Sequence, residues 1–459
     1  MLTMKKVFYL LAFTAIVWRC TPADQVNPVI TSPAANVTAN YSADFLHDWI
    51  NLECLLVKET PGFFPPQAAR VFGLTGVTAY EAAYRGIPGA RSLTSQLNGF
   101  GSYPMPPADA LSVQYHWSIV TNAAVAEIMR FSFGKSLSAE NLGTLNKLEA
   151  ANFELFRKEA PSRAVAELSQ KLGKEIAAAV FEYSKTDGGH EAYLTPFSKT
   201  HKLPVGPDKW VPTNSKFPSP LCPDWDKCRP MLASNMAYAV SPKPVAFSTD
   251  PKSEFYKIAL QVYNTVKNVT PEQVEIAKFW ADDPFATCTP TGHTFGILTQ
   301  LLKETNATLE KSVVAYAKLG IAENDAFITC WKLKYDYNLI RPVSYIQKYI
   351  DPNFKTVIGT PPFPAYTSGH ATESAVGERV FIEMFTNGDG AYPLTDRTQL
   401  RHGLGIRKFT NFKQASEECA DSRLFGGIHY DMDNKRGLQM GRALGDNVLK
   451  AIQWPKNVK

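Results

Sequence analysis

Three short clusters in the last third of the chain carry side chains that can bind an anion and move a proton. The clusters read ITCWKLKYDYNLIRPV, AYTSGHATES and ADSRLFGGIHYDMDNKRG. Their polar candidates are, in chain order, Lys334 and Arg341, then Ser368, Gly369 and His370, then Arg423, His429 and Asp433. Each cluster also has an ordinary structural explanation, so each is weighed first by itself.

The first cluster places two cations on a face that should be buried. Residues spaced by four, three, four and three positions form one stripe on a helix, and here they are Phe327, Trp331, Lys334, Asn338 and Arg341. Two large apolar residues lead the stripe, which predicts a core-facing side of a helix over 308–340 that ends before Pro342. Buried cations need a partner. Lys334 and Arg341 could reach solvent or pair with carboxylates, but two such cations favour a shared anion.

The second cluster predicts the start of a helix. Ser368 is a natural N-cap, and the amides of Gly369 and His370 would point out of the helix start, where the helix dipole favours negative charge. Glycine has no side chain to obstruct an approaching oxyanion. By itself Ser-Gly-His is more often a plain cap than an anion site.

The third cluster pairs an imidazole with a carboxylate. Asp433 lies four residues after His429, which puts both on one helical face, where the carboxylate can orient the ring. Arg423 lies six residues before His429. Taken singly, the histidine could be a core residue and the arginine a surface ion-pair partner.

Together the three clusters predict a site for a tetrahedral oxyanion such as phosphate or vanadate. They supply three cations, a helix N-terminus, two histidines and an orienting acid within residues 327–433. Guanidinium groups match the geometry of tetrahedral oxyanions well.

The remaining sequence predicts a helical body that holds these clusters. Of 459 residues, 45% are hydrophobic, and the net charge is only +5 with interleaved signs, so nucleic acid is not expected as a partner. Apolar residues recur with a helical period from residue 43. Helices are predicted at 66–85, 108–131, 138–160, 162–184, 252–266, 271–281, 291–303 and 308–340. We predict an all-α fold of helical bundles, with one helical domain over 43–459 and a proline-rich excursion at 195–255.

The N-terminus has the pattern of an export signal. Residues 1–20 combine a short basic start with an apolar run too short to span a membrane, and residues 21–42 read as a linker. Cys20 could carry a lipid anchor, or the signal could simply be cleaved. Either way the protein is expected in the periplasm or at the cell envelope. In an oxidising compartment Cys222 and Cys228 could form a disulfide, with buried free thiols as the alternative.

The three clusters resemble the signature of the type-2 phosphatidic acid phosphatase superfamily, which includes the vanadium-dependent haloperoxidases. The resemblance covers roughly the last 130 residues and departs at Thr367, where proline is usual. Within the superfamily, phosphatases use the second histidine as a nucleophile. This sequence could therefore be an exported acid phosphatase with a phosphohistidine at His429.

Three features make the haloperoxidase reading the preferred one. About 300 residues precede the motifs, whereas soluble phosphatases of the group are much shorter. The stretches TPGFFPPQAARVFGLTGVTAYEAAY, KWVPT and EQVEIAKFWADDP…TPTGH are similar to bacterial haloperoxidases. Trp331 and Phe363 match the Trp and Phe beside the vanadate in chloro- and iodoperoxidases. The pattern as a whole is most similar to bacterial vanadium iodoperoxidases.

The resemblance implies a role for each matched residue. His429 would coordinate vanadium, supported by Asp433. Charge on the vanadate oxygens would be offset by Lys334, Arg341 and Arg423, with Ser368 and Gly369 as hydrogen-bond donors. His370 would be the acid–base partner, with a pKa near neutral, and Lys334 would polarise peroxide. Asp282 and Asp283 are the candidates for a carboxylate that would raise the pKa of His370.

The implied activity is oxidation of a halide by hydrogen peroxide to hypohalous acid, which halogenates small organic acceptors. Iodide is the preferred halide because the pattern is most similar to bacterial iodoperoxidases, although the motifs themselves do not report the choice of halide. Trp331 and Phe363 would line the approach of the halide. Oligomeric state stays open.

Overall fold

The computed structural model describes residues 36–104, 115–213, 215–239, 242–388 and 390–458, and it confirms the all-α prediction. Helices dominate the described residues, and the two strands found there, β1 (Leu394–Asp396) and β2 (Arg407–Phe409), form one short antiparallel pair. The predicted signal at 1–20 and residues 21–35 of the predicted linker lie outside the described residues. None of the helices described is long and apolar enough to cross a membrane.

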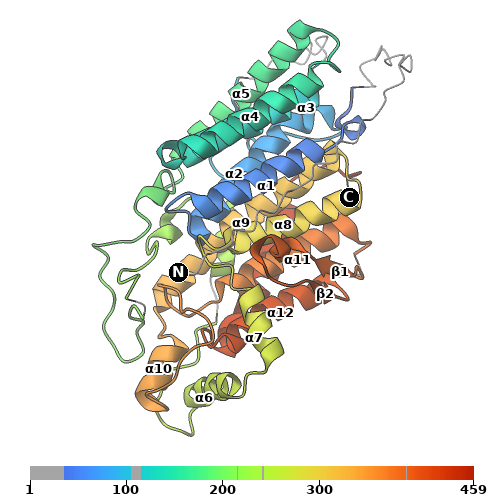
Figure 1. Ribbon diagram of the computed structural model, residues 1–459. Helices are drawn as coiled ribbons and strands as arrows, with labels where there is room; N and C mark the ends of the chain where they lie inside the picture. The colour runs from blue at the N-terminus through green and yellow to red at the C-terminus, as the bar shows by residue number, and fades with distance from the viewer. Residues whose placement is uncertain (1–35, 105–114, 214, 240–241, 389, 459) are drawn as a thin grey trace, which may run out of the picture.

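The helices stack in layers along an elongated molecule (Figure 1). At one end lie α3, α4 and α5, followed by α1 and α2, then α8 and α9, then α11, with α6 and α10 at the opposite end (Figure 1). Their bounds are α1 (Asp44–Glu59), α2 (Pro65–Ala83), α3 (Trp117–Phe133), α4 (Ala139–Phe156), α5 (Arg163–Lys185), α6 (Glu254–Lys267), α7 (Pro271–Phe279), α8 (Thr289–Glu304), α9 (Leu309–Tyr337), α10 (Pro342–Tyr349), α11 (Gly369–Phe385), α12 (Phe412–Phe425) and α13 (Asp431–Ala451). The helix predicted from residue 108 begins at Trp117 among the described residues, and 108–114 lie outside them.

The proline-rich segment at 195–255 is mostly irregular, and it packs against the end of α9 that carries the first cluster. It contains the short 3-10 helices Trp225–Lys227 and Ala233–Ala239. The backbone of residues 208–210 bonds to residues 338–340, and the carbonyl of Leu221 accepts from the Trp331 indole at 3.3 Å. This segment therefore helps to fix the helix end. The disulfide considered for it is wrong, since Cys222 and Cys228 are both buried free thiols.

A second, smaller core lies under the first and third clusters. It joins α6, α10 and the residues before α13 through aromatic contacts, among them Phe255 with Tyr345 at 5.1 Å and Phe255 with Tyr430 at 5.3 Å between ring centroids. The side chains are fully buried. They anchor the start of α10 and the start of α13 to one another.

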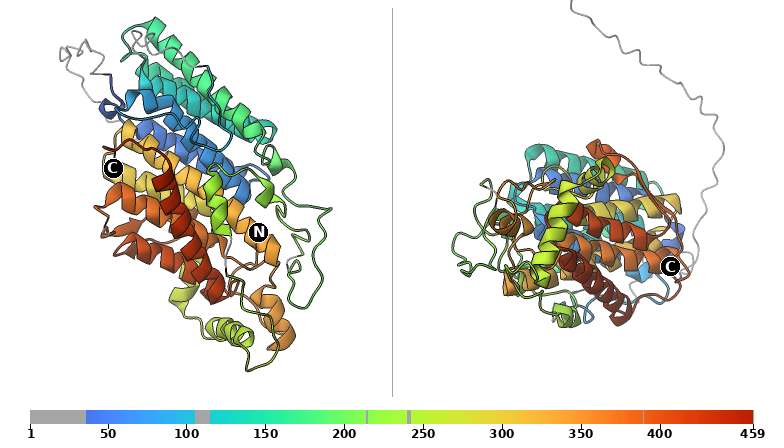
Figure 2. Two further views of the ribbon diagram at one scale, coloured as in Figure 1. Left: turned by 180° about the vertical axis from the view of Figure 1, so that it is seen from behind. Right: turned by 90° about the horizontal axis from the view of Figure 1, so that it is seen from below.

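Close approach of α11 and α13 brings the second and third clusters together. A glycine stripe on α13, made of Gly437, Gly441 and Gly445, faces α11. A Cβ built at Gly441 would lie only 2.0 Å from the carbonyl oxygen of Thr372, which leaves no room for a side chain. The long C-terminal helix crosses the back of the molecule beside these elements (Figure 2).

Gly441→Ala is therefore expected to destabilise the fold by about 1–3 kcal/mol, because the backbones must separate. The matched control is Gly143→Ala on α4, where an added Cβ meets nothing within 4 Å. That variant should be stabilised by about 0.5–1 kcal/mol through helix propensity. Urea unfolding of both variants checks the pair, and equal effects would contradict the close-packing account.

Candidate oxyanion site

The three clusters meet at one buried junction between the end of α9, the start of α11 and the loop between α12 and α13. The ammonium of Lys334 donates to the carbonyls of Pro364 and Ala365, each at 3.1 Å, and to that of Thr367. Its side chain therefore lies against the segment that leads into Ser-Gly-His. The guanidinium of Arg341 donates to the carbonyl of Phe363 at 2.9 Å, so it reaches the same segment.

The predicted continuous helix over 308–340 is wrong at its end. α9 stops at Tyr337, and Asn338 caps it in the left-handed conformation with φ of 48°. Residues 339–340 are extended because they bond to residues 208 and 365 instead of continuing the helix. Arg341 is the N-cap of α10, and Pro342 begins that helix rather than ending α9. Lys334 and Arg341 meet through this turn and not through a shared helical stripe.

His429 and Asp433 make the predicted contact with a different backbone arrangement. His429 lies before the first turn of α13, so the two residues do not share a helical face. The Nδ1 atom of His429 lies 2.9 Å from a carboxylate oxygen of Asp433, and the same oxygen accepts the amide of Tyr430 at 3.1 Å. A carboxylate at Nδ1 places the ring proton there and leaves the lone pair on Nε2.

That lone pair faces a cation. Nε2 of His429 lies 3.0 Å from the Arg341 guanidinium, which donates to it. Burial is the main cause that holds the pKa of His429 well below its ordinary value, and Arg341, Lys334 and Arg423 lower it further. The imidazole is therefore neutral and able to coordinate an electrophilic centre through Nε2.

Arg423 and His370 form the other side of the junction. Arg423 donates to the carbonyl of Ala277 at 3.2 Å and lies 3.4 Å from Nε2 of His370. Ser368 is the N-cap of α11, as predicted, and its hydroxyl oxygen accepts the amide of Ala371. A Cβ built on Gly369 would meet no atom closer than 3.9 Å, so the position where a side chain would stand is open. Gly369 and His370 are partly exposed while Ser368 is buried, which marks the open side of the junction.

The electrostatics of the junction call for an anion. Lys334, Arg341 and Arg423 are at most 1% exposed. In the described part of the chain their hydrogen bonds run to backbone carbonyls, a serine hydroxyl and histidine nitrogens, and none runs to a carboxylate. Buried cations without counter-charge are costly.

Two further observations agree with an oxyanion. One guanidinium nitrogen of Arg341, Nη2, is buried and has no hydrogen-bond partner among the described residues. Burial, with Arg341 adding to it, lowers the pKa of Lys334 to about 7, which a bound anion would reverse. The described residues contain no group of three or more His, Cys, Asp or Glu side chains suited to a bare metal ion. The donor set therefore fits a tetrahedral oxyanion whose central atom could take one imidazole.

The expected near-neutral pKa of His370 is wrong for this structure. Burial and the neighbouring Arg423 hold its pKa well below the ordinary value. Asp282 does not offset this, because its carboxylate bonds to Nδ1 of His293 at 2.8 Å and to Gln399 at 2.7 Å. The ring of His370 instead bonds through Nε2 to the carbonyl of Ala281 at 3.2 Å.

Trp331 and Phe363 lie beside the cations as an aromatic wall. Their ring centroids are 4.9 Å apart, and the ammonium of Lys334 lies 5.0 Å from the Phe363 ring. Arg341 lies 5.1 Å from the same ring. Phe363 is the more exposed of the two aromatic residues, at 9% against 1%. The junction is thus lined by cationic side chains and, next to them, by the aromatic rings of Trp331 and Phe363.

Thr367 contributes more than the sequence suggested. Besides the carbonyl that accepts from Lys334, its hydroxyl donates to the backbone carbonyl of Asp433 at 2.8 Å. Proline, usual at this position in the resembled signature, has no hydroxyl for that bond. The departure at Thr367 therefore adds a link between the second and third clusters.

Sequence reasoning also missed a buried charge cluster behind the junction. His293 on α8 lies between two carboxylates, Asp282 at 2.8 Å and Asp396 at 2.9 Å. Burial alone would lower the pKa of His293, but the two carboxylates outweigh it and raise the pKa to about 10. The cluster holds the turn after α7 whose Ala281 carbonyl contacts His370. The isolated His in TPTGH was the available signal, but nothing in the sequence placed Asp396 beside it.

His293→Gln is expected to destabilise the fold by about 3–5 kcal/mol at neutral pH, because two buried carboxylates lose their counter-charge. Since the folded pKa is raised, the imidazolium stabilises the fold fully below pH 6.5, and this contribution is lost as the pH rises toward about 10. Urea unfolding at pH 6 and pH 9.5 measures it. A wild-type stability that does not fall relative to the variant over this range would contradict the charged cluster.

Asp433→Asn is expected to weaken binding of inorganic phosphate, a tetrahedral probe, by about 10–100-fold, as for other residues that orient a ligand. The asparagine can no longer fix the ring proton of His429 on Nδ1. Isothermal titration calorimetry measures the affinity. The control is Asp431→Asn, the partly exposed first residue of α13, whose carboxylate pairs with Lys435 and which should bind phosphate as the wild type does. Equal affinities in both variants would remove Asp433 from the site.

Comparisons with known proteins identify relatives of this chain. Residues 314–455 match the family model described as the VCPO second helical-bundle domain. The chain is 30% identical to the protein in a solved structure described as the first bacterial vanadium-dependent iodoperoxidase, covering 92% of this chain and 99% of that one with a TM-score of 0.81. A search of curated proteins finds no match.

More distant structures show the same fold. A holo-type bacterial vanadium-dependent chloroperoxidase is 14% identical over 86% of this chain and 95% of its own, with a TM-score of 0.63. The apo-type structure is 13% identical over 90% and 98%, with a TM-score of 0.66. At this identity the likeness concerns the fold alone.

Proposed function

The chain belongs to the vanadium-dependent haloperoxidases, a family that oxidises halides with peroxide, and on that premise we propose that it is an iodide peroxidase that binds vanadate at the junction described above. The observation that carries the proposal is the set of three buried cations without carboxylate partners around the neutral His429. Such a set matches a doubly or triply charged oxyanion.

Each side chain of the junction has a task in this proposal. His429 would hold the vanadium through Nε2, with Asp433 fixing the ring. Lys334, Arg341 and Arg423 would offset the charge on the oxygens. The Ser368 hydroxyl and the Gly369 amide would donate hydrogen bonds. Vanadate held in this way supplies a Lewis acid that activates hydrogen peroxide toward a halide.

His370 is placed to move protons at the open side of the junction. It is partly exposed, whereas its neighbour Arg423 is buried. In the protein alone its low pKa keeps the ring neutral, and the negative charge of a bound oxyanion would raise that pKa toward the range in which the ring can take a proton from peroxide. Lys334 would polarise the peroxide. Trp331 and Phe363 would exclude water from the approach of the halide and leave a polarisable surface for it.

Iodide is proposed because of the likeness to the bacterial iodoperoxidase, which extends over nearly the whole of both chains. The chloroperoxidase structures support the fold but not the choice of halide, given their low identity. Iodide is also the easiest of the halides to oxidise. Small organic compounds would accept the oxidised halogen.

A halide panel tests this function. Protein freed of oxyanions by dialysis should oxidise iodide with hydrogen peroxide only after vanadate is added, with much lower rates for bromide and chloride. A parallel assay of phosphate-monoester hydrolysis serves as the comparison. If phosphatase turnover exceeds vanadate-dependent iodide oxidation, and a phosphohistidine forms at His429, the proposal is wrong.

We also propose export, from the pattern of residues 1–20 and Cys20. Expression of the full chain in a bacterium, followed by mass spectrometry of the mature N-terminus, tests this. A mature chain beginning at Cys20 with a lipid supports anchoring. An intact N-terminus in the cytoplasm would overturn export.

A further inference from the structure

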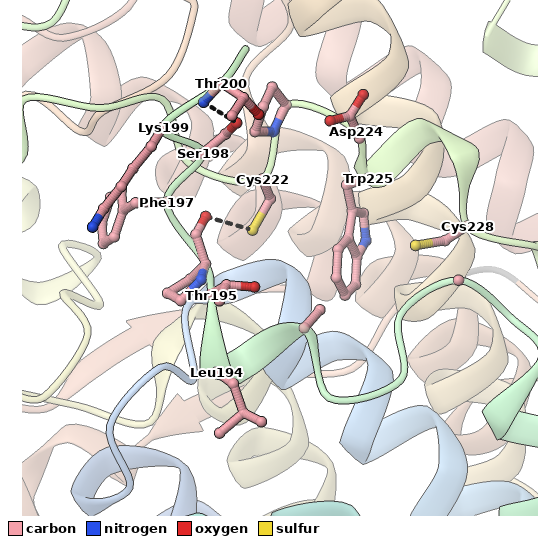
Figure 3. A pocket seen from close by; sticks show the side chains of 14 residues that line it. Leu194, Thr195, Phe197, Ser198, Lys199, Thr200, Cys222, Asp224, Trp225 and Cys228 are labelled. Carbon is pink, nitrogen blue, oxygen red and sulfur yellow. Dashed lines mark hydrogen bonds between the residues drawn. The ribbon is translucent and has the colours of Figure 1, made fainter.

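A cavity of about 660 Å3 lies outside the junction, between the chain after α5 and the segment around Cys222 (Figure 3). Its lining includes apolar side chains, Leu194, Phe197 and Trp225, together with the hydroxyls of Thr195 and Ser198. In the view of Figure 3 the Trp225 indole stands between the thiols of Cys222 and Cys228. The volume lies within the range of cavities that hold small organic ligands.

One wall of this cavity is in contact with the aromatic side of the junction. Cys222 lines the cavity, and the carbonyl of its neighbour Leu221 accepts hydrogen bonds from the indole of Trp331 at 3.3 Å and the hydroxyl of Tyr335 at 2.6 Å. The amide of Leu221 donates to the carbonyl of Pro362, next to Phe363. A single stretch of backbone therefore separates the cavity from Trp331 and Phe363.

A chain of aromatic rings leads from the cavity to an exposed ring at the protein surface. Phe197 of the lining contacts Phe64 at 5.0 Å, and Phe64 contacts Phe285 at 5.5 Å between ring centroids. Phe285 is 44% exposed, which is unusual for a large apolar ring. It lies two residues after Asp283, whose pKa burial raises although the Arg423 guanidinium lowers it in part. The ring chain thus starts at the cavity and ends at the exposed ring of Phe285.

The lining indicates the class of ligand. Flat apolar surfaces from Phe197 and Trp225 suit an aromatic ring. Several hydroxyls and the exposed Lys199 ammonium at the cavity can bond to a phenolic oxygen. The thiol of Cys222 is not a free nucleophile there, because it donates to the carbonyl of Pro196 at 3.4 Å and burial raises its pKa to about 12. A neutral, partly polar aromatic compound fits this combination better than an anion or a peptide.

We propose that this cavity binds a small phenolic compound and presents it to hypoiodous acid leaving the junction. The proposal rests on the proposed function, which supplies the hypoiodous acid. In the transfer, the O–I bond of hypoiodous acid breaks as a C–I bond forms on the ring. The displaced ring proton leaves with the hydroxide as water, so iodine is reduced and the ring carbon is oxidised. The enzyme would then iodinate a bound acceptor in preference to compounds free in solution.

The test places a large side chain in the cavity and measures both the binding of an aromatic probe and its iodination. Thr195→Trp places a large ring in the cavity from an exposed position, and Val205→Trp is the matched control on the same segment, fully exposed and outside the lining. The probe is 2-naphthol, whose fluorescence reports binding to vanadate-free protein. The second readout is the ratio of iodonaphthol to triiodide formed with vanadate, iodide and peroxide. Leu194→Trp, a second exposed lining position, repeats the test independently.

We expect saturable naphthol binding that weakens at least about tenfold in Thr195→Trp and Leu194→Trp, and stays unchanged in Val205→Trp. The iodonaphthol-to-triiodide ratio should fall in the same two variants, while triiodide formation alone stays at the wild-type rate. Absent or non-saturable binding, or a ratio equal to that given by added hypoiodous acid in every variant, would overturn the proposal. Loss of triiodide formation in the wild type would instead refute the proposed function, because naphthol binding needs no vanadate.

Discussion

His429→Ala should lose vanadate-dependent iodide oxidation by at least about 10³-fold, the scale on which removal of a central catalytic group acts. The variant removes the only neutral imidazole nitrogen that faces the Arg341 guanidinium at the junction of the described residues. The carboxylate of Asp433 then has no ring to orient. Initial rates of triiodide formation with saturating vanadate measure the loss.

The matched control for this variant is His190→Ala. His190 is partly exposed and lies against Phe181, away from the three clusters. Its replacement should leave iodide oxidation within about twofold of the wild type, as expected for a surface position. If His429→Ala kept the wild-type rate at saturating vanadate, His429 could not be the residue that coordinates vanadium.

Arg341→Met should remove the stabilisation that vanadate or phosphate gives to the protein. In the wild type, an anion at 100 times its Kd stabilises the fold by about 2.7 kcal/mol. Losing a buried charge partner weakens binding by about 2–5 kcal/mol, so the same anion concentration should barely act on the variant. The unpartnered Nη2 of Arg341 is the atom that we expect the anion to satisfy. Thermal unfolding with and without 1 mM anion measures the difference.

Arg379→Met is the control for this second prediction. Arg379 forms a surface ion pair with Asp446 at 2.6 Å, outside the junction. Its variant should keep the full rise in melting temperature on adding vanadate. A rise of the same size in Arg341→Met would mean that the anion binds elsewhere.

His370→Ala separates binding from chemistry at the same site. His370 contacts Arg423 and a backbone carbonyl but carries no charge at neutral pH. Its loss should therefore affect turnover far more than anion affinity.

The sequence was sufficient to predict the residues of the junction because their chemistry is unusual for a core. Cations on an apolar stripe, a serine cap before a glycine, and a histidine four residues before an aspartate each have an ordinary explanation, but together they predict an anion site. The N-cap at Ser368 follows from such a local rule, whereas His429 and Asp433 make the predicted contact without the shared helical face that predicted it.

The parts that sequence reasoning missed depend on contacts between distant segments. The end of α9 is set by Asn338 and by backbone bonds to residues 208–210, which a helical period cannot reveal. The cluster around His293 requires Asp396, more than 100 residues away, to fold against α8. The pKa of His370 depends on where the Asp282 carboxylate lies. This carboxylate bonds to His293, a contact that only the tertiary structure reveals.

The most direct measurement titrates vanadate into oxyanion-free protein while iodide oxidation is followed. The account predicts that the rate rises from near zero, saturates at one vanadate per chain, and falls again when phosphate competes for the same cations. A rate that is independent of vanadate, or one that phosphate cannot lower, would contradict the claim that these buried cations and His429 hold one oxyanion.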